Sequence, residues 1–466
     1  GDWSSDVCSS DLLSILFLGL MQLCYAADIK SPQPFIVNGK KAVWSDFKKA
    51  KYNIFFDINT KKSFAYSEIT FEISQTGYPI FDVLGTPTSV KINNVEVGQL
   101  EIDTPNKESK VRIAHRKLTP GTYLLSIKSP IVKGVSYKKG ELAAGFFMKD
   151  MKDRELLERY IPANYEYDQF KINLSIHVND ESNKYELFTN GEMQTDEKGI
   201  THVSYPEYFT SSSLYFHLTK KSKFKRIDYK YRSVDGRDLP ITIYSKSTRL
   251  NRRLKRKVNK VIKELEGDYG PWPHPQFILY GTGKLRGGME YAGAAVSGWF
   301  AVGHELQHNY FARSVMPANG DAGWIDEAVA SWRDFFSLSR KKPKYDSMNL
   351  GNHGQYVRKT DKRSYKSGRS FMAYINNLLK KESSKLGEKC LKDFFKEYYI
   401  KNKFKTITSE SFRSDLEAYA GRSFKEEFKR YIYGNNMPLS HDHHDHAENE
   451  NPYHPDLTDE QLNDLL

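Results

Sequence analysis

The pentapeptide His304–His308, of sequence His-Glu-Leu-Gln-His, constrains the fold of this chain more than any other segment. Its two histidines are four residues apart, which is about one helical turn, so on a helix both imidazoles point toward one spot. Two imidazole nitrogens and one carboxylate oxygen bind Zn²⁺ and leave a fourth coordination position open. The spacing therefore predicts a helix with two ligands of a hydrolytic zinc site, and with Glu305 beside them.

The third ligand is expected from Glu327, within the segment Trp324–Leu338. Apolar residues of that segment recur at helical intervals, which predicts a second helix. The stretch Val296–Gly303, just before the two histidines, is expected to be a helix that enters the core. Two packed helices can bring the Glu327 carboxylate to the metal ion. The alternative is that the pentapeptide arises by chance on an amphipathic helix.

Length and charge limit the number of domains and the kinds of partner that the chain can have. The 466 residues suffice for two or three domains, and a hydrophobic content of 39% favours a folded chain. The net charge of +12 would suit nucleic acid, an anionic membrane or an acidic substrate. The basic residues are spread along the chain and no nucleic-acid motif is present, so we expect a solvated basic surface and no nucleic-acid partner.

Residues 1–26 are not expected to belong to the folded domains. Residues 1–11 lack a start Met and resemble translated adapter sequence, and the apolar run at 12–23 is short for a bilayer span. Together with the small Ala26, this run indicates the remnant of a secretory signal. We therefore expect a bacterial protein exported to the periplasm or the medium, without stable membrane insertion after cleavage. A lipoprotein linked at Cys24 and a membrane anchor are the alternatives.

Residues 45–220 have the pattern of a β domain. The runs Tyr52–Ile58, Ser63–Ile73 and Phe170–Val178 alternate between apolar and polar residues, as half-buried strands do. In Val90–Val97 an Asn-Asn pair indicates a hairpin turn. The sequence therefore predicts an N-terminal antiparallel β-sandwich or saddle.

Residues 235–438 have the pattern of a second, mainly helical domain. Ser247–Glu266 is expected to be an amphipathic helix, and Phe277–Tyr280 a short buried strand. Further helices are expected at 370–381, 388–401 and 423–433. Residues 439–466 are polar, acidic and rich in His, so they are expected to be disordered, with metal collection by the histidines as the alternative to a solvated tail.

These motifs resemble those of the aminopeptidase N-like gluzincin family. That family has His-Glu-x-x-His followed by eighteen residues and a Glu, and residues 309–326 are the intervening eighteen here. Its Gly-x-Met-Glu-Asn motif is similar to Gly287–Tyr291, and its Tyr before a helix is similar to Tyr365. Likenesses at Arg159–Asn164 and Phe428–Pro438 extend the resemblance over about residues 45–438.

The resemblance implies an α+β fold, with the β domain followed by a mainly helical, thermolysin-like zinc catalytic domain and without the family's helical C-terminal domain. It implies one Zn²⁺ per chain and a stabilising role for the Tyr365 hydroxyl at the oxyanion. Asp326 is expected to orient a metal ligand. The implied substrate-binding residues lie on an edge strand of the cleft, and the last of them would hold a free α-ammonium: Gly288, Met289 and Glu290.

Taken together, these residues predict a zinc metallopeptidase. Its metal ion would be held by His304, His308 and Glu327, and Glu305 would be the general base. An aminopeptidase acting on peptides is the leading interpretation. A zinc endopeptidase with an open cleft and a non-catalytic protein that binds peptides or metal are the alternatives. The sequence does not indicate an oligomeric state.

Overall fold

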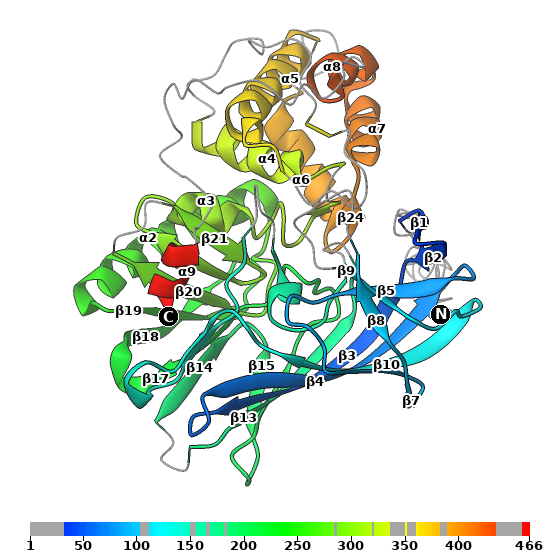
Figure 1. Cartoon of the computed structure of the whole chain (residues 1–466). Coiled ribbons are helices and arrows are strands. Elements are labelled where there is room, and N and C mark those ends of the chain that lie inside the picture. The colour runs from blue at the N-terminus through cyan, green and yellow to red at the C-terminus, as the bar shows by residue number, and fades with distance from the viewer. Residues whose placement is uncertain are drawn as a thin grey trace, which may run out of the picture.

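The computed structural model describes residues 32–102, 111–149, 155–164, 168–180, 184–283, 287–318, 321–335, 350–351, 360–382, 389–434 and 459–466. Strands dominate the first half of these residues and helices most of the remainder, which confirms the α+β architecture. The helices of residues 324–431 gather in one lobe, and the sheets together with the other helices form the rest of the described molecule (Figure 1). Within the described ranges, no helix combines the length and the apolar character that a bilayer span requires.

The largest sheet has eight strands in the order β15-β16-β13-β3-β4-β10-β6-β7. Burial alternates along its two longest strands, as the sequence pattern predicts. Asn93 and Asn94 have φ values of 51° and 65° between β6 and β7, which confirms the predicted hairpin turn. The strands are β3 (Asp46–Asp57), β4 (Lys62–Ile73), β6 (Ser89–Ile92), β7 (Val95–Glu96), β10 (Gly121–Pro130), β13 (Lys171–Val178), β15 (Glu192–Thr195) and β16 (Thr201–Ser204).

The described residues of this part of the chain also form two smaller sheets, and the prediction of an antiparallel domain is wrong in two places. β3 runs parallel to β13, and β2 runs parallel to β5, because the connections between these strands are long enough to return the chain to the same end. One sheet contains β1 (Phe35–Val37), β2 (Lys40–Val43), β5 (Tyr78–Asp82), β8 (Gln99–Glu101) and β9 (Val111–Ala114), and the other β11 (Val135–Ser136), β12 (Ala143–Gly145), β14 (Tyr185–Thr189) and β17 (Phe216–Lys220).

A five-stranded sheet joins the two halves of the molecule. Its order is β18-β19-β20-β22-β21, formed by Lys225–Arg232, Asp238–Ser245, Phe277–Thr282, Ala294–Gly298 and Gly288–Tyr291 respectively. Alternate residues point to opposite faces of a strand. On β20, Ile278 and Tyr280 pack into a first core shared with the eight-stranded sheet, whereas Phe277 and Leu279 pack into a second core among the helices. The strands β20, β21 and β22 are therefore buried on both faces, whereas the edge strand β18 is exposed at alternate residues.

Helices α2 (Thr248–Tyr269) and α3 (Val302–Gln307) cover the second face of that sheet. α2 begins at Ser247, whose side chain accepts a hydrogen bond from the Leu250 N–H and so caps the helix. It is followed by α3, α4 (Trp324–Phe335), the π-helical turn η4 (Ser364–Gly368), α5 (Arg369–Glu382), α6 (Leu391–Asn402), α7 (Ser409–Ala420) and α8 (Lys425–Tyr431), while β23 (Met316–Pro317) pairs with β24 (Thr406–Ile407).

One expectation about local structure needs correction. The stretch expected to be a helix at 296–303 is instead the end of β22, a turn, and the start of α3 at Val302. A short apolar run buried on both sides fits a strand as well as a helix, so its periodicity could not decide. Residues 336–338, expected to continue the α4 helix, lie outside the described residues.

The expected disorder of the tail is wrong for its last eight residues. α9 (Asp459–Leu465) packs beside β20, where Leu462 and Leu465 are buried in the first core (Figure 1). The Tyr280 hydroxyl donates a hydrogen bond to the Leu465 carbonyl at 3.2 Å. The two leucines are three residues apart and form a small apolar face that the polar composition of the tail obscured. The His-rich segment lies outside the described residues.

Candidate metal centre

Three side chains from two helices converge on one point. His304 lies in α3, His308 follows directly after its last residue, and Glu327 lies in the first turn of α4. The Oε2 atom of Glu327 is 3.2 Å from Nε2 of His304 and 3.6 Å from Nε2 of His308. All three residues are buried, and their possible ligand atoms lie within 4.8 Å of one another. The convergence predicted from the spacing is therefore present.

These three atoms fit a zinc ion. Two tetrahedral ligands, each about 2.1 Å from Zn²⁺, lie about 3.4 Å apart. The two distances from the Glu327 oxygen, 3.2 and 3.6 Å, lie on either side of that value. Two imidazoles and one carboxylate are the ligand set of a catalytic rather than a fully coordinated structural zinc site. The geometry and the chemistry of the donors thus agree with the metal that the sequence predicts.

The orientation of His304 depends on a residue that sequence reasoning missed. Its Nδ1 atom is 2.9 Å from Oδ2 of Asp334, which leaves Nε2 directed at Glu327. Asp326, which is expected to orient a metal ligand, accepts a hydrogen bond with its carboxylate from the N–H of the ligand Glu327 at 2.6 Å. Asp334 follows Glu327 by seven residues, or about two helical turns, so its place on the same face of α4 could have been read from the sequence.

The electrostatic field at the cluster favours positive charge. Burial lowers the pKa of His304, but Asp334 and Glu327 outweigh this effect and hold that pKa well above its ordinary value. Burial acts to raise the pKa of Glu327, whereas His308, His304 and the Tyr365 hydroxyl lower it overall. The carboxylates that stabilise a proton on the imidazole also attract a divalent cation to the same place.

Glu305 lies on the side of α3 that faces the edge strand β21. Burial raises its pKa well above the usual range, His304 opposes this, and the charges of Glu290 and Glu327 add to the rise. Gly288 makes room for this side chain, because a Cβ atom at that position would lie 2.5 Å from Cδ and Oε1 of Glu305. The glycine of the edge-strand motif therefore has a steric role beside the expected base.

Tyr365 reaches the cluster from the π-helical turn η4. Its hydroxyl donates a hydrogen bond to Oε1 of Glu327 at 2.7 Å, and its ring stacks on His304 with centroids 5.9 Å apart. Burial, followed by the charge of Glu327, raises the pKa of Tyr365 well above its ordinary value, so the hydroxyl keeps its proton. A Cβ atom at Gly368 would lie 2.7 Å from Cβ of Ala328, which shows how closely η4 packs on α4.

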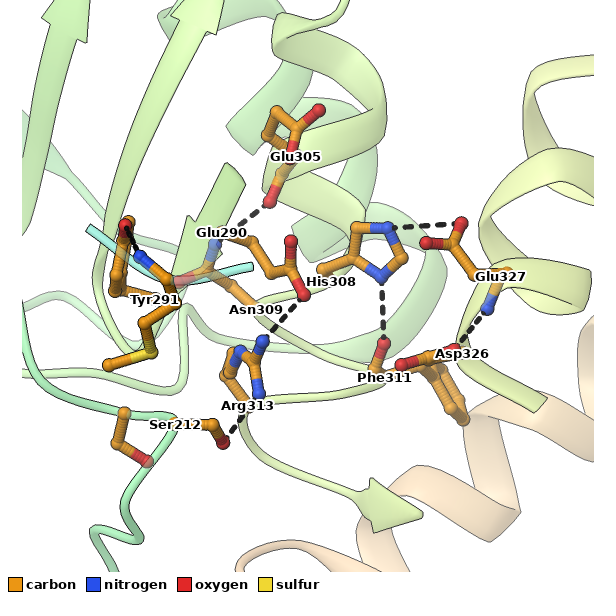
Figure 2. A network of polar contacts seen from close by, with 12 residues as sticks. Ser212, Glu290, Tyr291, Glu305, His308, Asn309, Phe311, Arg313, Asp326 and Glu327 are labelled. Carbon is orange, nitrogen blue, oxygen red and sulfur yellow. Dashed lines mark hydrogen bonds and ion pairs between the residues drawn. The ribbon is translucent and has the colours of Figure 1, made fainter. Parts of the chain in front are cut away.

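The edge strand presents only part of its motif to the cluster. Glu290 lies on the same face of β21 as Gly288, and its Oε1 atom is 2.7 Å from Nη2 of Arg313 (Figure 2). Met289 points to the opposite face and is buried in the first core, so its side chain packs rather than binds substrate. Tyr291 also belongs to that core, where its hydroxyl accepts a hydrogen bond from the Met148 N–H at 3.2 Å.

The comparisons with known proteins identify a fold. No family model matches the sequence, and no curated protein matches it. Among solved structures, similar ones include an M1 zinc metallopeptidase from Deinococcus radiodurans, with a TM-score of 0.60 and 13% identity over 84% of this chain and 95% of that chain. Leukotriene A4 hydrolase from Saccharomyces cerevisiae has a TM-score of 0.62 and 12% identity, over 85% and 69%. Aminopeptidase A from Legionella pneumophila, in complex with aspartic acid, has a TM-score of 0.61 and 13% identity, over 88% and 50%.

The chain therefore has the fold of the M1 zinc metallopeptidases and related aminopeptidases. The family resemblance inferred from the motifs is confirmed at the level of fold. Within that fold, the cluster of His304, His308 and Glu327 supplies the donors for zinc.

Proposed function

We propose that this protein is a zinc-dependent metallopeptidase that hydrolyses peptide bonds in a thermolysin-like catalytic domain. The observation that carries the proposal is the convergence of His304, His308 and Glu327, with ligand atoms within 4.8 Å of one another. Two further groups of suitable chemistry flank this cluster. They are the Glu305 carboxylate above Gly288 and the Tyr365 hydroxyl beside Glu327.

The residues divide the chemistry among them. When bound by the three ligands, zinc supplies Lewis acidity, which polarises a carbonyl group and makes water a better nucleophile. Glu305 takes a proton from the attacking water, and because its pKa is raised it can hold this proton and pass it to the leaving amine. The Tyr365 hydroxyl, which keeps its proton, is a donor for the oxyanion that forms as water adds to the carbonyl.

An aminopeptidase is the finer form of this proposal, and it depends on Glu290. A carboxylate beside the metal can bind a free α-ammonium and so place the first peptide bond at the reacting centre. A peptidase that does not require a free N-terminus is the second candidate. The internal ion pair between Glu290 and Arg313 favours it, because the charge of Glu290 is already compensated.

The test is hydrolysis of a broad peptide library by the zinc-loaded protein, followed by mass spectrometry. Glu305→Gln is expected to lower kcat/KM by about 10²-fold or more while zinc content stays near one per chain. The matched control is Glu197→Gln, which changes an exposed carboxylate in a β-turn outside the metal cluster. Stoichiometric zinc with no turnover of any peptide would instead support a non-catalytic binding protein.

A further inference from the structure

A buried ion pair occupies the site where the sequence places recognition of the substrate N-terminus. Glu290 and Arg313 have side-chain exposures of only 5% and 2%. Nη2 of Arg313 contacts Oε1 of Glu290 at 2.7 Å, and Nη1 donates a hydrogen bond to Oγ of Ser212 at 2.6 Å. These residues come from β21, from the segment after α3 and from the loop before β17, and the guanidinium lies between the other two (Figure 2). Three distant parts of the chain thus converge on it.

The backbone after α3 directs Arg313 toward this position. The Arg313 N–H donates a hydrogen bond to the His308 carbonyl at 2.9 Å, so the backbone of Arg313 is tied to that of a metal ligand. Ala312, just before it, has a φ of +149°, which is unfavourable for a residue with a side chain. Strained backbone persists where the surrounding structure fixes it, commonly at sites that hold ligands.

The guanidinium changes what Glu290 can bind. Arg stays protonated at every working pH, so the compensating charge is permanent. An α-ammonium at the other carboxylate oxygen would lie within about 5 Å of the guanidinium, and the repulsion between them would offset much of the attraction to Glu290. Both partners are nearly excluded from solvent, which limits the screening of this repulsion.

We propose that Arg313 determines substrate specificity by neutralising the charge of Glu290. The substrates are then peptides that are recognised without a free α-ammonium, so that N-blocked peptides are cleaved and internal peptide bonds are hydrolysed. The inference rests on the proposed peptidase function. The expected protease recognises the residues on either side of the scissile bond rather than the charge at the N-terminus of the peptide. Glu290 then acts as a positioning residue, because it holds Arg313, which in turn donates a hydrogen bond to Ser212.

The experiment compares two peptides of one sequence, one with a free N-terminus and one N-acetylated. For the wild-type zinc enzyme, kcat/KM is expected to agree within about threefold between them. Arg313→Gln removes the positive charge but keeps a donor for Ser212, so the ratio of free to acetylated peptide is expected to rise at least about tenfold. Arg313→Lys is the matched control, because it keeps the charge and is expected to keep the wild-type ratio.

A binding measurement gives a readout without turnover. In the zinc-loaded Glu305→Gln protein, isothermal titration calorimetry of the same two peptides is expected to give similar Kd values. Adding Arg313→Gln is expected to tighten binding of the free peptide alone, by about tenfold or more. If the Arg313 variants fail to fold by circular dichroism, Glu290→Gln serves instead. The inference expects this variant to keep the ratio of the two peptides, whereas an ammonium-binding Glu290 would lose preference for the free one.

Two outcomes overturn the inference and differ from each other. A wild-type preference of about 100-fold or more for the free peptide would show that Glu290 binds the ammonium despite Arg313, with the peptidase proposal intact. Failure of the zinc-loaded protein to cleave these peptides or any other peptide of the library would overturn the peptidase proposal itself, and the specificity inference with it.

Discussion

The Nδ1 atom of His304 is hydrogen-bonded to Oδ2 of Asp334 at 2.9 Å, while Nε2 on the other side of the ring faces Glu327. A neutral imidazole carries one proton, so this contact places it on Nδ1 and leaves the lone pair of Nε2 for a metal. Asp334 thus fixes the tautomer of the metal ligand His304 without being a metal ligand itself.

Asp334→Asn is expected to weaken zinc affinity by about 10- to 100-fold, because the amide orients the imidazole less strongly and adds no negative charge. Competition with a chromogenic chelator measures this change. Asp238→Asn, at a carboxylate on β19 that is 49% exposed, is the control and should retain the wild-type affinity. Equal affinities for all three proteins would contradict the role assigned to Asp334.

Gly288→Ala is expected to lower kcat by about tenfold or more, because the new Cβ atom would collide with the Glu305 carboxylate and move the base by a few tenths of an ångström or more. Gly283→Ala is the matched control, since a Cβ atom there meets no described atom within 4 Å. Steady-state kinetics on one peptide compare the two. Wild-type kcat in the Gly288 variant would show that the base does not need this space.

Tyr365→Phe is expected to lower kcat on the order of 10²-fold, with little change in KM, because it removes one hydrogen-bond donor from the oxyanion and no binding group. The ring stacks on His304 and is retained in the variant, so zinc content by mass spectrometry should stay near one per chain. Unchanged kcat would restrict the hydroxyl to its contact with Glu327.

Stability is expected to fall in acid because of His274. Burial lowers the pKa of His274 to about 3, against about 6.5 in an unfolded chain. Between these values the unfolded chain binds a proton that the folded one does not, so the free energy of unfolding decreases as pH falls below 6.5. The contribution approaches 1.4 kcal/mol per pH unit, about 1.4 kcal/mol between pH 7.5 and 5.5.

Urea unfolding at those two pH values measures this contribution, and His274→Gln should reduce the difference by about that amount. In the folded protein, Nδ1 of His274 is 3.0 Å from the Tyr208 hydroxyl and Nε2 is 3.2 Å from the Asn309 carbonyl, which suits the neutral ring. A ring resonance of His274 that titrates near pH 6.5 in the folded state would contradict the prediction.

The metal ligands could be predicted from the sequence because local spacing fixes their geometry. His304 and His308 share one helical face, and a nearby helix delivers Glu327. The long strands β3 and β4 could also be predicted, because the alternation of apolar and polar residues along them follows their burial. In both cases the signal lies within about twenty residues of chain.

Features that depend on distant partners could not be predicted. The sequence around Glu290 does not indicate its ion pair with Arg313, because the pair forms only when β21 and the segment after α3 are folded side by side. The inward direction of Met289 depends on which face of β21 meets the first core. The parallel pairing of β3 with β13 depends on a register between segments more than one hundred residues apart.

The five-stranded sheet has a further consequence for the way the molecule unfolds. Tyr280 and Phe277 of the same strand belong to different cores, so removing either half of the chain would bare one whole face of the sheet to water. Neither half is then expected to be stable as a separate fragment, and calorimetry of the intact chain should show one heat-absorption peak rather than two. Dissecting this protein at the link between its strands and its helices would therefore yield aggregates, not modules.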